Sequence, residues 1–171
     1  QEMRLVSLNA APAVEVFAAH AEATDQQFDP ADPLPFFLHN IIGIQSGNDF
    51  KLRVPLSVAP DGSVLCAAAV PSGATVRIMR PAASASEAGA LATRSAIAKL
   101  NGHQPRIALF FDCVATRLRM GKDFGLELDT VAQALAPAEY LGCNTHGQIA
   151  RAEGQFGGFH NCTAVVCVFP E

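Results

Sequence analysis

A row of small polar side chains interrupts an apolar segment near the end of the chain. The segment reads LGCNTHGQIA over residues 141–150, and between positions 143 and 148 the thiol of Cys143 is the only apolar side chain. The flanking residues are typical of strands, so the row is expected inside a sheet. Buried polar groups need hydrogen-bond partners from the protein or from a ligand. The row therefore predicts either the lining of a pocket or a set of core residues that bond to one another.

A second candidate site is the end of the apolar run in FFDCVATR, residues 110–117. A near-continuous apolar run is typical of a strand that is covered on both faces, and loops at strand ends often carry ligand-binding groups. Cys113 stands where this strand should end, and Arg117 follows just beyond it. The guanidinium fork of Arg117 suits a carboxylate or phosphate, although a surface ion pair is an equal alternative. Cys113 alone is more typical of a core thiol.

Two further chemistries remain open at these positions. A cysteine hydrolase would use Cys113 as nucleophile and His146 or His160 as base, within about 2.6 to 3.2 Å of each other. No nucleophile-elbow or cysteine-protease motif surrounds this cysteine. A metal site would need His146, His160, Cys143 and Cys162 to converge as a tetrahedron. We expect neither an enzyme nor a metal or other cofactor.

The first half of the chain should contain one helix followed by extended segments. Asn9 is a suitable N-cap for an amphipathic helix that ends near residue 23. Residues 24–35, TDQQFDPADPLP, are rich in Asp and Pro and predict a loop or crossover. From residue 36 to 80 the pattern is extended, and Pro60-Asp61-Gly62 is a strong hairpin signal. Three strands joined this tightly must pair antiparallel, as a meander.

The second half should add two helices and three strands. Residues 84–100 and 120–135 have helical patterns, with the apolar strand of residues 105–114 between them. Residues 139–150 and 159–169 are joined by a Gly-rich segment and predict a C-terminal hairpin. The predicted fold class is α+β: a mostly antiparallel sheet of about six strands, made of a three-strand meander, one buried strand and a C-terminal hairpin, with about three helices.

Composition limits the possible partners and compartments. The 171 residues suit one domain, residues 1–171, and the opening QEMRLV suggests a segment cut from a longer chain. A formal charge of -4 with no basic run argues against nucleic acid, and the apolar runs are too short to span a membrane. The five cysteines are odd in number and lie among apolar neighbours. We expect them to be reduced and mostly buried, in a cytoplasmic protein.

Five stretches, in order, resemble the C-terminal half of the FIST domain, a sensory module of bacterial signal-transduction proteins that also occurs in some eukaryotic F-box proteins. The stretches are PAVEVFAAHA, DGSVLCAAAVPSGATVRIMRP, ALFFDCVATR, LGCNTHGQIA and FHNCTAVVCVF, and they span nearly the whole chain. The family's strand-end Cys and the Arg that follows it correspond to Cys113 and Arg117. Its Gly-Phe-x-Thr-x-Gly-Glu-Ile-like stretch and its closing His-Asn-x-Thr are matched by Gly142, Thr145, Gly147, Ile149, His160, Asn161 and Thr163.

The resemblance implies a sensory domain that binds small ligands, proposed to include amino acids, beside an N-terminal FIST half and a signalling output domain or partner. Gln148 departs from the family, which usually has Glu there: Gln keeps an acceptor, adds donors and loses the charge. The resemblance and the polar row together predict a ligand-binding set of Cys113, Arg117, Thr145, His146, Gln148 and Asn161. Arg117 would hold an anionic group of the ligand, such as that of a small metabolite. The main alternative is a protein-interaction module in which the polar row is structural.

Overall fold

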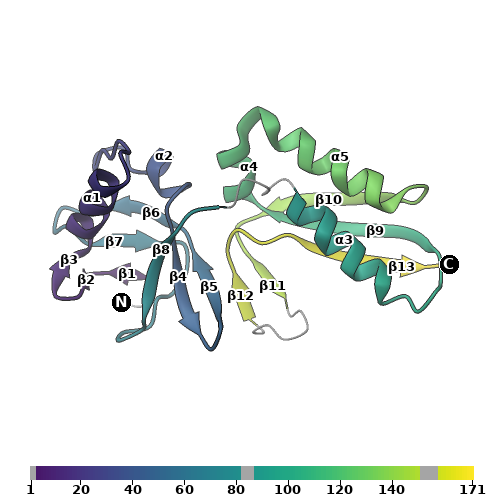
Figure 1. Cartoon of the computed structure of the whole chain (residues 1–171), viewed down its shortest axis with the longest axis horizontal. Coiled ribbons are helices and arrows are strands. Elements are labelled where there is room, and N and C mark those ends of the chain that lie inside the picture. Colours follow the sequence, from purple (N-terminus) through teal and green to yellow (C-terminus); the bar gives the residue numbers. More distant parts are fainter. Residues whose placement is uncertain (1–2, 82–86, 151–157) are drawn as a thin grey trace. The chain divides into compact units, whose positions relative to one another are not determined.

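The computed structural model describes residues 3–81, 87–150 and 158–171. The chain divides into two compact units, Gln1–Pro81 (unit 1) and Ala82–Glu171 (unit 2) (Figure 1). Helices and mostly antiparallel strands occur in both, which confirms the α+β class. In the described residues, however, the strands are divided among five small sheets instead of one sheet of about six strands.

Unit 1 contains three of these sheets and two helices. The three-stranded sheets have the orders β1-β7-β6 and β5-β4-β8, and β2 and β3 form a short ribbon; all of these pairs are antiparallel. The bounds are β1 Arg4–Leu5, β2 Ser7–Leu8, β3 Ala11–Pro12, α1 Ala13–Ala23, α2 Leu34–Phe37, β4 Ile41–Ser46, β5 Asp49–Arg53, β6 Pro55–Val58, β7 Val64–Cys66 and β8 Val76–Met79. Residues 24–33 form turns and irregular backbone before α2 begins.

The hairpin predicted at Pro60-Asp61-Gly62 is present between β6 and β7. Gly62 has φ 78°, a conformation that glycine adopts without strain. The Asp61 carboxylate accepts a hydrogen bond of 3.0 Å from the backbone N–H of Ser63, which fixes the turn. The antiparallel pairing expected for this half of the chain is confirmed at this hairpin, but the predicted three-strand meander is wrong. The next strand, β8, pairs with β4 and not with β7, whose other edge is taken by β1.

The core of unit 1 forms where α1 meets the aromatic residues of α2. Ala13, Phe17 and Ala21 recur every four residues along α1, and all three are buried. The ring of Phe17 lies edge-on to that of Phe37, with centroids 4.9 Å apart. The amphipathic pattern read from the sequence thus selects the face of α1 that packs.

Unit 2 is built on the long apolar strand β9 (Pro105–Cys113), which lies between two other strands (Figure 1). Strand β10 (Glu139–Thr145) pairs with it in parallel, and β13 (Val165–Pro170) pairs with it antiparallel. The remaining elements are α3 Ala88–Ala98, α4 Val114–Met120, the 3-10 helix η2 Gly121–Asp123, α5 Phe124–Leu135, β11 Gln148–Ala150 and β12 Gly158–His160. The three longest helices, α1, α3 and α5, are the three that the sequence predicts.

The C-terminal hairpin is confirmed only at its tip, where β11 pairs antiparallel with β12. The long strands β10 and β13 pair with opposite edges of β9 and not with each other. A buried strand has hydrogen-bonding groups along both edges, and two neighbours satisfy them. The helices α4 and α5 supply the long crossover that a parallel return from β9 to β10 requires.

One face of this sheet is covered by helices. Ala108 and Phe110 alternate along β9 and pack in one core cluster with Val131 and Leu135 of α5, and Ile97 of α3 joins them. The odd-numbered residues of β9 therefore point to the opposite face. Three of the residues that line the candidate site, Phe111, Thr145 and Val165, stand on that face.

All five cysteines are free, but the expectation that most are buried is wrong. Cys66 and Cys113 are buried, Cys162 is half-buried, and Cys143 and Cys167 are exposed. Cys143 and Cys167 pair in register with Phe111 and Leu109. They therefore stand on the sheet face opposite the helices, which an apolar sequence context does not reveal. Separately, no helix in the described ranges is both long and apolar enough to span a membrane.

Candidate functional site

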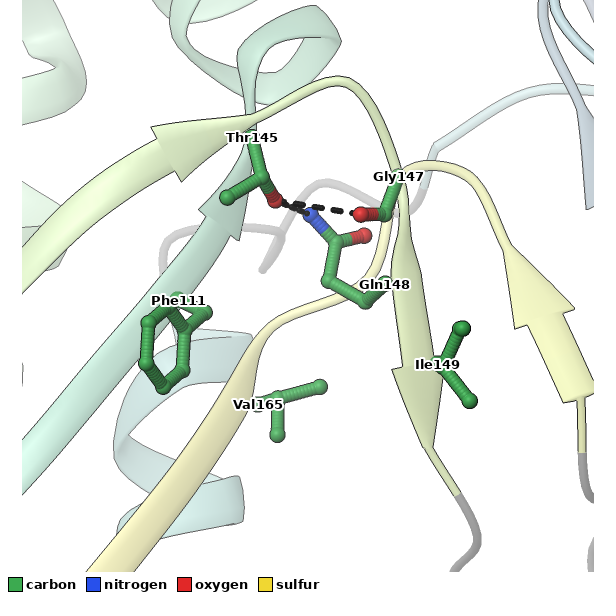
Figure 2. Close-up of a pocket in the computed structure, with 6 residues that line it drawn as sticks. All are labelled: Phe111, Thr145, Gly147, Gln148, Ile149 and Val165. Atoms are coloured by element: carbon green, nitrogen blue, oxygen red, sulfur yellow. Dashed lines mark hydrogen bonds between the residues drawn. The ribbon is translucent and has the colours of Figure 1, made fainter.

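A hollow of about 200 Å³ opens in unit 2 where β9, β10, β11 and β13 come together (Figure 2). Its lining combines apolar walls with a small polar group: Phe111, Thr145, Gly147, Gln148, Ile149 and Val165. Phe111 and Val165 are paired residues on neighbouring strands. Small-molecule sites typically join such apolar walls to a few placed polar groups. Thr145 and Gln148 were predicted for the site from the polar row, and both line the hollow.

The polar part of the hollow is a short hydrogen-bonded chain (Figure 2). The side-chain amide of Gln148 donates from Nε2 to Thr145 Oγ1 at 2.7 Å, and this hydroxyl donates to the carbonyl of Gly147 at 3.2 Å. The side-chain carbonyl oxygen of Gln148, Oε1, is buried and has no hydrogen-bond partner among the residues that the structure describes. A ligand that donates a hydrogen bond would satisfy this oxygen.

Gly147 shapes the turn that carries Gln148. It has φ 154°, and a Cβ added at this position would collide with the ring of Phe159. Both facts require glycine here, because a side chain would be strained and would displace the ring. The sequence comparison with the FIST pattern singled out this glycine, and the structure supplies the physical reason.

Asn161 stabilises the same turn by a hydrogen bond to its backbone. Its side chain is buried, and Nδ2 donates to the backbone carbonyl of His146 at 3.4 Å. The His146 side chain is exposed, and neither residue is among those that line the hollow. Both were predicted as ligand residues; the structure places Asn161 where it positions the turn.

Cys113 is the register partner of Thr145, so the structure brings the two predicted residues onto adjacent strands. The thiol of Cys162 and the backbone N–H groups of Cys162, Ala115 and Thr116 donate hydrogen bonds to the Cys113 sulfur. The Cys162 thiol contributes most, and together these donors outweigh burial and lower the pKa of Cys113 to about 6. Donation to Cys113 and burial raise the pKa of Cys162 far above its usual value.

The predicted ligand residue Arg117 lies on helix α4. It is exposed, and its guanidinium carbon is 5.5 Å from the centroid of the Phe124 ring. This is the distance of a cation–π contact. Arg117 is not among the residues that line the hollow.

Two buried carboxyl groups on the helix side of the sheet were missed at the sequence level. Asp112 and Glu127 are each 1% exposed, and each has one carboxyl oxygen with no hydrogen-bond partner in the described ranges. Burial, followed by repulsion from Glu127, raises the pKa of Asp112 to about 7. Burial also raises the pKa of Glu127, although the backbone N–H of Gly89 donates to it at 3.2 Å. One signal was available: Glu127 falls on the apolar stripe of α5, in phase with Phe124, Val131 and Leu135.

A metal site and a cysteine hydrolase are the two other chemistries that the sequence leaves open for this region. Within the described residues, no three His, Cys, Asp or Glu side chains gather as metal ligands would. Along the described stretches of the chain, the groups that lower the pKa of Cys113 by hydrogen bonding are the thiol of Cys162 and backbone N–H groups. The expectation that the chain is not an enzyme stays a prediction.

Comparison with known families places these observations in context. The FIST C domain family model matches residues 13–151, a range that reaches into both units and contains most of the residues lining the hollow. No curated protein and no solved structure matches the chain. The matched range covers well over half of the sequence, and the chain belongs to the FIST C domain family.

Proposed function

We propose that this FIST C domain is a sensory domain that binds a small metabolite in the hollow of unit 2. One observation carries the proposal: the side chain of Gln148 lines the hollow, and its buried carbonyl oxygen has no hydrogen-bond partner within the described part of the chain. An unsatisfied buried acceptor costs about 1–3 kcal/mol, so a ligand that donates a hydrogen bond to it would recover that free energy. The family's role in signal transduction supports the sensory reading.

The lining suggests the chemical class of the ligand. A volume of about 200 Å³ lies below the range of drug-sized pockets, so a small metabolite suits it. The ring of Phe111 and the branched side chain of Val165 would contact an apolar portion, and Gln148 Oε1 would accept from an N–H or O–H group. A free amino acid with an apolar side chain has both features, because its ammonium group is a donor.

Replacing Gln148 by leucine should weaken amino-acid binding about tenfold or more, because the variant keeps the volume but loses the acceptor. The measurement is calorimetric titration of the wild type and the variant with each free amino acid in turn. Gln133→Leu is the matched control, since Gln133 is exposed on α5, away from the hollow. Equal affinities of wild type and Gln148→Leu for every amino acid bound would remove Gln148 from the site.

The role predicted for Arg117, which is to hold an anionic group, has its own test. The Arg117→Ala variant removes the guanidinium from an exposed position, so the fold should be retained. If Arg117 holds the carboxylate of an amino acid, its loss weakens binding while leaving the contact with Gln148. If binding depends only on the hollow, the affinity does not change, because Arg117 does not line it.

A protein-interaction module is the second candidate, favoured by exposed apolar residues on the open face of the unit 2 sheet. Leu141 is 67% exposed and Phe169 is 47% exposed, although both stand beside β9. Exposed apolar patches of this kind often mark protein contacts. In this case Leu141→Lys would weaken partner binding while Gln148→Leu would not.

We further propose that the domain acts in the cytoplasm beside an N-terminal FIST half and an output domain or partner. The five free thiols support a reducing compartment. The acidic net charge of -4 supports a partner other than nucleic acid.

A further inference from the structure

The hydroxyl group of Thr145 lies between the side-chain amide of Gln148 and two backbone carbonyl groups. Its oxygen, Oγ1, is 2.7 Å from Nε2 of Gln148 and 3.2 Å from the carbonyl oxygen of Gly147 (Figure 2). The carbonyl oxygen of Asp112 is 3.5 Å from the same atom. A carbonyl oxygen only accepts hydrogen bonds, whereas a hydroxyl group has one proton to donate and two lone pairs with which to accept. The single proton of Thr145 therefore already has two acceptors among the backbone groups.

This proton count decides which way the amide group of Gln148 points. With Nε2 toward Thr145, the amide donates to a lone pair of the hydroxyl group while the hydroxyl donates to Gly147, so both protons have acceptors. If the amide were turned by half a rotation, Oε1 would become a third acceptor beside one proton. The observed orientation is the one that the hydroxyl group can satisfy.

The walls of the hollow disfavour the turned amide for a second reason. Gln148 is 5% exposed, and the turned amide would direct the N–H groups of Nε2 to the place that Oε1 now occupies. The lining residues beyond the turn are Phe111, Ile149 and Val165, whose side chains have no acceptor. Buried N–H groups without an acceptor are costly. The acceptor Oε1 is therefore the group that the hollow presents.

The backbone holds the hydroxyl group of Thr145 in the absence of any ligand. Gly147 follows Thr145 by two residues, and the ring of Phe159 fills the space that a side chain at Gly147 would need. Thr145 ends strand β10, and its branched side chain has few allowed rotations. The order of donors and acceptors in the hollow is thus set by the turn itself.

We propose that Thr145 determines the specificity of the hollow by holding Gln148 so that only a hydrogen-bond acceptor faces the ligand. This inference rests on the proposed ligand-binding function and adds the rule of selection. A ligand with an N–H or O–H group at this point is accepted, whereas a ligand of the same shape with a carbonyl oxygen there sets two acceptors against each other. The hollow therefore selects 2-amino acids against the 2-oxo acids of the same carbon skeleton.

The orientation is tested first, without ligand, by nuclear magnetic resonance of the isotope-labelled full chain. In the wild type we expect nuclear Overhauser contacts between the side-chain amide protons of Gln148 and the side-chain protons of Thr145. Thr145→Val keeps the branched shape but removes the hydroxyl group, so the amide loses its fixed orientation and these contacts weaken. Thr145→Ser keeps the hydroxyl group and is the matched control, in which the contacts persist.

The specificity is then measured by calorimetric titration with valine and leucine and with the 2-oxo acid of each. The wild type should bind each amino acid at least about tenfold more tightly than its 2-oxo acid. Thr145→Val should lower this ratio to about threefold or less, because the freed amide presents either its oxygen or its nitrogen to the ligand. Thr145→Ser should keep the ratio of the wild type. A merely structural role of Thr145 would weaken both compounds alike and leave the ratio unchanged.

The outcomes separate this inference from the proposed function. Contacts of equal strength in the wild type and Thr145→Val, or a binding ratio that Thr145→Val leaves unchanged, would overturn the role of Thr145 while the hollow remains a binding site. If none of the four compounds binds, the proposed amino-acid site is contradicted, and the selectivity with it, whichever way the amide of Gln148 points.

Discussion

Replacing Asp112 by asparagine is expected to stabilise unit 2 by about 4 kcal/mol near pH 8 and by less than about 1 kcal/mol near pH 4. Burial and repulsion from Glu127 raise the pKa of Asp112 from 3.8 to about 7, which means that the folded protein favours the protonated form. The stability that this group contributes is fully present below its unfolded pKa of 3.8. It is lost as the pH rises through about 7. Asparagine has no proton to lose, so the variant escapes this loss.

The measurement is denaturant unfolding at both pH values, followed by tyrosine fluorescence. The chain has one tyrosine and no tryptophan, and Tyr140 lies in β10, so the signal reports on unit 2. Asp129→Asn is the matched control, because this carboxylate is exposed on α5. A stability difference between wild type and Asp112→Asn that is the same at both pH values would show that Asp112 has an ordinary pKa.

Removing the ring of Phe17 should destabilise unit 1 by about 3–5 kcal/mol, the range for truncating a buried aromatic residue to alanine. Phe17 is fully buried, and its ring contacts Phe37 and Phe36 at centroid distances of 4.9 and 6.4 Å. The variant Phe17→Ala loses these contacts and leaves a cavity between α1 and α2. Far-ultraviolet circular dichroism during denaturant unfolding measures the loss.

Phe28 provides the control for this second variant. It belongs to the same aromatic cluster, with its centroid 4.8 Å from that of Phe36, but it is only half-buried. Phe28→Ala should therefore cost clearly less than Phe17→Ala. An equal cost for both, or a loss below about 1 kcal/mol for Phe17→Ala, would contradict the packing described for this core.

Local signals in the sequence predicted the local structure. The turn at Asp61-Gly62 is a local signal, because its hydrogen bond and its positive φ involve only residues 61–63. The helix α1 follows from the spacing of its apolar residues. The pairing of β10 and of β13 with β9 could not be predicted from local signals, because it depends on which edge of β9 each strand joins. The strand–helix–strand order from residue 105 to 145 was the overlooked indication of the parallel pair.

The candidate site was predictable to a similar extent. The polar row from Thr145 to Gln148 was found because polar residues in an apolar segment are conspicuous. Arg117 could not be placed, because its direction depends on how α4 leaves β9 and on the contact with Phe124. The partner of Cys113 could not be found either, since Cys162 reaches it only through an irregular segment far along the chain.

The claim that the hollow binds a small metabolite is tested most directly by nuclear magnetic resonance of the labelled chain during titration with each free amino acid. The side-chain amide signal of Gln148 is assigned by its absence in Gln148→Leu, and the methyl signals of Ile149 and Val165 report on the walls. We predict that at least one amino acid shifts all three sets of signals together and saturably, while the amide signal of Gln133 stays in place. Saturable shifts confined to residues outside the hollow, or no shift with any amino acid, would contradict the assignment of this hollow as an amino-acid site.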